Sequence, residues 1–276
     1  MPLPEGLLAP ISEESPGGIE VMYEDSYARV ASLRDVRNPE HSFEEVAELA
    51  TQILEEESKD LTIAVWLTEA WLSLDGFAGL DSGLRLLHGL CDRFWDHLYP
   101  EAVEDRAFTL EFVGEGLTNR GDRYEHIKFV PLTDWGHHLY HFEESRGIRK
   151  DSFGAEDPKK AKGKKKAEDD DDPRAPTSEN FENGFAETPK QRYKDLRAEL
   201  AACSEAVTLV EDLAKERFAE LKGPKPSFAK LKEVVTKATT AVQSLLDKKL
   251  ELDPDPVVET PVEAPGAEEL VLAHCA

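Results

Sequence analysis

The chain has 276 residues, which is enough for one domain of ordinary size and a smaller second unit. Its 33 Lys and Arg residues stand against 57 Asp and Glu residues, so its formal net charge is −24. A chain of this charge repels nucleic acid and anionic lipid, and we therefore expect neither as a partner.

The N-terminal segment is rich in Pro and Gly up to Gly18, which predicts an extended, turning start. An apolar helical face then runs from about residue 20 to residue 36, and an Asn-Pro pair ends it. Ser42 and the glutamate three residues later form a capping box, in which each side chain bonds a free backbone amide. The helix that follows has apolar residues on one face and glutamates on the other, so we expect it to be half-buried with a solvated acidic face.

The stretch 58–100 is the predicted centre of the core. Its first half is apolar on nearly every side of a helix, and only a thin stripe of Thr62, Glu69 and Ser73 is polar. A helix of this kind is one that other helices enclose.

The ends of the helices in this stretch are marked by capping and breaking residues. Ser58 suits the N-cap of the first helix, and Asp75-Gly76 suits its end. We expect residues 76–80 to form a tight connection to a second helix, which Asp81 caps and Pro100 closes.

The remaining chain changes character twice. A shorter helix is expected over 106–117, and a brief apolar run follows near residue 130. A lysine run and an aspartate run then predict a disordered linker, because blocks of like charge cannot bury enough apolar area to offset chain entropy. After it, apolar residues repeat every seven positions on both sides of a Gly-Pro break, which predicts an antiparallel helical hairpin.

The sequence therefore predicts an all-α protein with four parts. These are a helical N-terminal domain over residues 1–148, the charged linker over 149–185, the hairpin over 186–251 and a Pro/Glu-rich tail over 252–276.

The HHLYH segment is the best candidate for a metal site. If it is helical, His137, His141 and Glu144 share one face, which is a spacing that metal ligands use. The chain has no HExxH motif and no supporting cysteine, and a Trp-Gly pair before the segment suggests an irregular loop. A structural or surface role is therefore the favoured interpretation.

No other pattern points to catalysis. Cys91, Cys203 and Cys275 lie far apart and form no CxxC pair, and no phosphate-binding loop or catalytic triad stands out. The N-terminus lacks a signal peptide, and no stretch is apolar and long enough to span a membrane. We expect a cytoplasmic protein with reduced thiols, no membrane insertion, no cofactor and no enzymatic activity.

Three segments carry a resemblance to a known family. LLAPISEESPGG at 7–18 precedes Tyr23 and Tyr27, the stretch 58–100 contains SKDL, WLTEA and paired glycines, and VPLT lies at 130–133. In this order they resemble the N-terminal domain of the ImpA/TssA family of bacterial type VI secretion systems. The resemblance covers about residues 1–148, and a linker with a hairpin also suits the family's layout. Longer members continue into a ring-building C-terminal domain, so ring assembly is not carried over.

The resemblance implies a non-enzymatic structural or assembly component. Such a protein would dock onto baseplate, membrane-complex or tube/sheath subunits of the secretion system. Two alternatives remain, a stand-alone helical adaptor or chaperone and a His-ligated metalloprotein, and the heptad seams also offer self-association. The family motif places these residues in the core: Leu61, Trp66, Leu67, Trp71, Gly76, Gly79, Leu87 and Trp95. The expected partner contacts are Ile11, Pro16, Gly18, Tyr23, Tyr27, Trp135 and His137.

Overall fold

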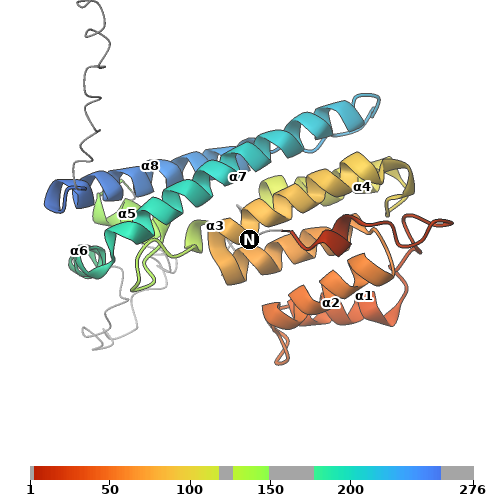
Figure 1. Ribbon diagram of the computed structural model, residues 1–276, viewed down its shortest axis with the longest axis horizontal. Coiled ribbons are helices and arrows are strands. Elements are labelled where there is room, and N and C mark those ends of the chain that lie inside the picture. Colours follow the sequence, from red (N-terminus) through yellow and green to blue (C-terminus); the bar gives the residue numbers. More distant parts are fainter. Residues whose placement is uncertain (1–2, 118–126, 149–176, 256–276) are drawn as a thin grey trace, which may run out of the picture.

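The computed structural model describes residues 3–117, 127–148 and 177–255, and in these ranges it contains eight α-helices and no β-strand (Figure 1). The predicted all-α class is confirmed. The helices are α1 (Asp25–Arg34), α2 (Phe43–Glu56), α3 (Leu61–Arg93), α4 (Val103–Glu111), α5 (Leu139–Ser145), α6 (Ser178–Glu187), α7 (Lys190–Arg217) and α8 (Ala229–Leu252).

Helix α3 folds back on itself at Gly76. The φ and ψ angles of this residue, 61° and −132°, lie outside the helical region, and L side chains rarely adopt a positive φ. The prediction of two helices in this stretch is confirmed, but the connection is one residue rather than 76–80. Asp81, the predicted cap, instead lies inside the second half and pairs with Arg85 at 2.8 Å.

The two halves of α3 pack in close contact because glycines line the seam between them. A Cβ on Gly79 would lie 2.0 Å from the carbonyl oxygen of Trp71. A Cβ on Gly83 would lie 2.4 Å from the side chain of Thr68. The segment is therefore a helical hairpin whose arms approach closely only where no side chain intervenes.

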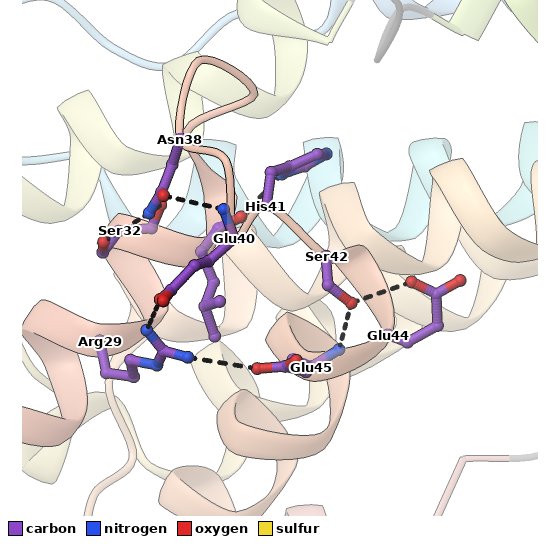
Figure 2. Close-up of polar contacts among 9 residues, drawn as sticks. Arg29, Ser32, Asn38, Glu40, His41, Ser42, Glu44 and Glu45 are labelled. Carbon is purple, nitrogen blue, oxygen red and sulfur yellow. Dashed lines mark hydrogen bonds and ion pairs between the residues drawn. The ribbon is translucent and has the colours of Figure 1, made fainter.

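Helices α1 and α2 cover one side of α3, and their corner is fixed by a polar network (Figure 2). The Ser42 hydroxyl accepts a hydrogen bond from the Glu45 amide at 3.1 Å, so the predicted N-cap is confirmed. The reciprocal half of the box differs, because the Ser42 amide donates to the Leu33 carbonyl. Glu45 instead pairs with Arg29, which also binds Glu40 at 2.7 Å.

Helices α7 and α8 form the predicted antiparallel hairpin, in which α7 covers the other side of α3 and α8 packs on α7 (Figure 1). Cys203 of α7 donates from its thiol to the carbonyl oxygen of Phe77, one residue past the α3 bend, at 3.0 Å. The heptad residues are buried in this packing, apart from partly buried Leu221 and exposed Leu252. One continuous core therefore joins helices that the sequence analysis assigned to two separate parts.

Three expectations for the core differ from the structure. Asp60, not Ser58, caps α3, because its carboxylate accepts hydrogen bonds from the backbone amides of Thr62 and Ile63. Within the polar stripe, Glu69 is fully buried and ion-paired with Arg34, whereas Thr62 is partly buried and Ser73 is exposed. Trp66 and Trp95 are only partly buried, whereas the other expected core residues of the motif are buried or occupy the α3 bend.

The predicted linker is replaced at its C-terminal end by helix α6, in which Thr177 caps the first turn and Phe181 and Phe185 are buried. Phe181 and Phe185 lie four residues apart and so share one face of the helix. This apolar face was not recognised in the sequence because it follows directly on the charged run. The rest of the predicted linker, and residues 256–276 of the predicted tail, lie outside the described residues. In the described ranges no helix is long and apolar enough to cross a membrane.

Replacing Gly79 by alanine tests the close contact inside α3. Alanine normally favours a helix over glycine by about 1 kcal/mol. Here the added methyl group meets a backbone carbonyl, so we expect Gly79→Ala to lower the free energy of unfolding by about 1–3 kcal/mol in urea titrations.

Gly223→Ala is the control, because a Cβ at that position meets no described atom within 4 Å. The control should keep wild-type stability. A Gly79→Ala protein as stable as the wild type would contradict the close packing of the two halves.

Candidate protein-interaction surface

The N-terminal segment is held rigidly against the start of α3 by paired glycines. The Gly17 carbonyl accepts from the Lys59 amide at 2.7 Å, and the Ile19 amide donates to Glu57 at 3.0 Å. Gly18 has a φ of 76°, and a Cβ there would lie 2.0 Å from the Glu57 carbonyl oxygen. The backbone that follows is therefore presented in one defined position.

Lys59 fixes the same segment from inside the protein. Its side chain is fully buried, and its amine donates to the carbonyl oxygens of Leu7, at 3.1 Å, and Leu54. The amine also lies 5.5 Å from the centre of the Phe94 ring. Burial lowers the pKa of Lys59 to about 8, and only Glu55 opposes this shift. One buried amine thus ties the N-terminal segment to the end of α2.

Past the glycines, three large apolar side chains are exposed around buried Val21. They are Ile19, Met22 and Tyr23, and we call them the N-terminal patch. Tyr23 is 84% exposed, which is unusual for a side chain that can bury a large area. Exposed apolar side chains grouped on one rigid segment are typical of a protein-interaction site.

The surroundings of the N-terminal patch are acidic. The chain has no Lys, Arg or His before Arg29. Five acidic residues around the patch are exposed, and none of them forms an ion pair with another described residue: Glu13, Glu14, Glu20, Glu24 and Asp25. This surface favours a partner that combines apolar and basic side chains.

The structure places the other expected contact residues differently from Tyr23. Ile11, Pro16 and Gly18 are partly buried in the N-terminal segment. Tyr27 packs against Trp66, with 4.8 Å between the ring centres. All four residues are therefore less accessible to a partner than Tyr23.

The remaining two expected contacts lie far from the patch in the fold. Trp135 donates from its indole nitrogen to Glu187 of α6 at 2.9 Å. His137 is fully buried under the same helix, so the expectation that it touches a partner is wrong for this conformation. A buried imidazole cannot form part of an exposed surface.

His137, His138 and His141 form a cluster in which the imidazole rings pack against one another. His138 stacks on His141 with 3.8 Å between ring centres, and His137 lies edge-on to His141 at 5.4 Å. Burial lowers the pKa of His138 to about 3 and that of His141 to about 4, with neighbouring histidines adding to both shifts. Among the described residues, no group of three or more His, Cys, Asp or Glu side chains has the geometry to hold a metal ion. The metal interpretation therefore has no geometric support here.

Sequence reasoning missed the buried charges. Arg106 is buried and donates to the carbonyl oxygens of Trp95 and Pro100, both at 2.6 Å, and its guanidinium lies over the Trp95 ring. It thereby holds the loop that ends α3. The SKDL motif could have indicated Lys59, since a lysine directly before a buried helix must either reach solvent or find carbonyl partners.

The buried amine of Lys59 should make stability depend on pH in the alkaline range. The unfolded chain holds this proton up to a pKa of 10.5, whereas the folded chain releases it at about 8. The unfolded state therefore binds more protons in this window, and the contribution of Lys59 to stability rises with pH. Urea titrations at several pH values should give a slope of unfolding free energy against pH that is steeper in the wild type than in Lys59→Met. The difference should be at most about 1.4 kcal/mol per pH unit.

Lys222→Met is the control, because Lys222 is exposed between α7 and α8. It should keep the wild-type slope. A constant difference between wild type and Lys59→Met from pH 8 to 10.5 would contradict the burial of the charge.

The histidine cluster should give a pH dependence of the same sign in the acid range, because its folded pKa values are also lowered. As pH falls below 6.5, His138 and His141 bind protons in the unfolded chain but not in the folded chain, because their folded pKa values are about 3 and about 4. The free energy of unfolding therefore decreases between about pH 6.5 and 4. His138→Gln should lose less stability over this range in thermal melts than the wild type. His88→Gln, at a histidine outside the cluster, should behave as wild type, and equal acid losses in all three proteins would refute the assignment.

Comparison with known proteins gives consistent results. The family model described as "ImpA, N-terminal, type VI secretion system" matches residues 8–114. A solved structure from Burkholderia cenocepacia, the N-terminal domain with the conserved ImpA_N region of a type VI secretion TssA component, superposes with a TM-score of 0.68 and 26% identity. The superposition covers 90% of this chain and 96% of that chain, so it extends well past the matched family region.

A curated relative is similar over a shorter region. The type VI secretion system component TssA1 of Pseudomonas aeruginosa is 30% identical over 106 residues, which is 34% of this chain. The matched region spans 30% of the length of that relative. Residues 8–114 of this chain therefore match the ImpA N-terminal region of type VI secretion systems, and the described fold is similar to that of a TssA N-terminal domain.

Proposed function

We propose that this protein is a non-enzymatic structural and assembly component of a type VI secretion system. The observation that carries the proposal is the superposition on the TssA N-terminal domain of B. cenocepacia, which covers 90% of this chain and so extends well past the family region. A likeness of this extent supports a shared role for the whole helical unit. We place its action on the cytoplasmic side of the machine.

In this proposal the protein works by docking onto other secretion subunits. The N-terminal patch provides exposed apolar area on a rigid backbone, and the acidic residues around it add charge selectivity. Rim charges of one sign mainly raise the association rate and reject partners of the same sign. A baseplate, membrane-complex or tube/sheath subunit with a basic, apolar surface fits this description.

The buried state of the reactive groups favours a non-enzymatic role. Cys91 and Cys203 are buried, and burial raises the pKa of Cys91 to about 12, so neither thiol is available as a nucleophile. Burial lowers the pKa of His138 and of His141, so both are held neutral, and His137 packs against the Phe181 ring.

Self-association through the heptad seams is not part of the proposal. Tyr193, Leu200, Val207 and their partners on α8 are buried within the hairpin and against α3. Opening that seam for a second copy would expose the core.

Affinity capture from the native cell tests the proposed function. The tagged full-length chain should enrich secretion subunits in mass spectrometry when the system is expressed. Replacing Ile19 and Tyr23 by serine should reduce this enrichment by about tenfold, because the apolar contact is lost. The matched control is Phe108→Ser on α4, where the wild-type ring is 80% exposed but lies outside the patch.

Each result has a distinct meaning. Capture that falls in the patch variant but not in the control supports docking through the patch. Capture that is unchanged in both refutes the patch and leaves the secretion role. Absence of every secretion subunit refutes the secretion role and favours a helical adaptor that works elsewhere.

A further inference from the structure

A groove of about 690 Å³ lies where α3 bends. Its floor is the last turn before Gly76, one wall is the loop between α1 and α2, and the other wall is the segment around Pro131. Val36 and Leu74 are exposed at its rim, although both are large apolar residues. Volume and lining are those of a site that accepts a few apolar side chains.

The wall formed by the α1–α2 loop is rigid before anything binds (Figure 2). Asn38 donates to the carbonyl oxygen of Ser32 at 3.0 Å and accepts from the Glu40 amide at 3.0 Å. A ring nitrogen of His41 bonds the Leu33 carbonyl oxygen at 2.7 Å, and its ring lies edge-on to Phe43. Little ordering cost therefore remains for an occupant of the groove.

The polar end of the groove is Arg192, in a cationic first turn of α7. Its contact with Glu199, at 3.7 Å, does not exhaust the five donors of a guanidinium. Lys190 and Lys194 flank it in sequence and already hold Asp253 and Asp255, with distances of 2.6–3.0 Å. The positive end of the α7 dipole adds to the attraction for carboxylates.

The chain continues from Asp255 for 21 residues that lie outside the described part. This tail carries four glutamates and one histidine but no lysine or arginine. Near its end, Glu268 and Glu269 directly precede the apolar run of Leu270, Val271 and Leu272. Two acids followed by three apolar residues match a groove that has Arg192 at one end and mainly apolar walls, with Asp75 as the one acidic residue of its lining.

We propose that the tail of the same chain occupies the groove at the α3 bend, with Leu270–Leu272 against the apolar walls and Glu268 or Glu269 at Arg192. The tail starts beside Lys190 and Lys194, one helix diameter of about 10–12 Å from the Arg192 side of α7. The 13 residues from 256 to 268 extend to about 43 Å or more, so the tail reaches the groove easily. A short tether also gives a high effective concentration, on the order of millimolar.

The thiol of Cys275 provides a first test in the full-length chain. Cys91 and Cys203 are buried, so Cys275 should be the thiol that reacts under mild oxidation with diamide. A Val36→Cys substitution places a partner at the rim of the groove. We expect a disulfide between residues 36 and 275 of the same molecule, identified by mass spectrometry of the unreduced digest.

The matched control is Leu209→Cys on α7, a leucine that is 42% exposed away from the groove. It should form a disulfide with Cys275 several-fold more slowly. Equal rates at the two positions would overturn the proposal, and so would disulfides found only between two copies, because those place a neighbouring molecule in the groove.

A peptide of residues 264–276, with fluorescein at its N-terminus and Ser in place of Cys275, provides the second test. The receptor is the full-length chain with Leu270, Val271 and Leu272 replaced by serine, which leaves the groove open. Fluorescence anisotropy should show binding to this receptor about tenfold tighter than to the wild type, whose own tail competes.

Substitutions in the groove assign the binding to it. Leu74→Glu in the open receptor should abolish binding, whereas Leu209→Glu, at a leucine of similar exposure, should leave it unchanged. Arg192→Glu should weaken binding, and a peptide with Glu268 and Glu269 replaced by lysine should restore it. Equal affinity for wild type and open receptor, or an unaffected Leu74→Glu receptor, would overturn the proposal.

Discussion

The constraint on which the structure depends is the apolar surface of α3, which extends around nearly the whole helix. No single layer can cover such a surface, so helices must pack on both of its sides. The α1–α2 pair covers one side and α7 covers the other, and α8 then covers the outer seam of α7. Even the two halves of α3 cover each other, which the glycines at 79 and 83 permit.

Within this apolar frame, a few buried charges decide how the pieces are oriented. Lys59, Arg106 and the Arg34–Glu69 pair each satisfy backbone carbonyls or an opposite charge in the interior. An unpaired buried charge is very costly, so each of these groups permits one arrangement of its neighbours. The N-terminal segment is positioned in this way, and with it the exposed Tyr23.

The sequence was sufficient for the parts of the fold that follow periodicity. The N-cap at Ser42, the break at Gly76 and the buried heptads of α7 and α8 were all predicted from spacing and from local chemistry. Helix α6 was missed because its two aromatic residues sit at the end of a charged run. The docking of α7 on α3 could not be predicted, because an exposed seam and a seam covered by a distant helix have the same pattern.

The candidate site was predictable only in part. Tyr23 was expected to contact a partner and is the most exposed aromatic residue described, whereas His137 was expected at the surface and is buried. Both residues lie in irregular segments, where the sequence has no helical periodicity from which buried and exposed positions could be distinguished. The environment of such residues depends on tertiary contacts, such as the cover that α6 provides for His137.

The packing of α7 on α3 separates covalent continuity from structural continuity. The helices before residue 149 and those after residue 176 complete a single core, yet one crossing of the chain joins them. If the chain were cut between residues 149 and 176, the two fragments would carry complementary apolar faces. Each fragment would then be stabilised by packing against the other. The fold is thus a natural case for fragment complementation, in which the interface and not the peptide bond holds the halves together.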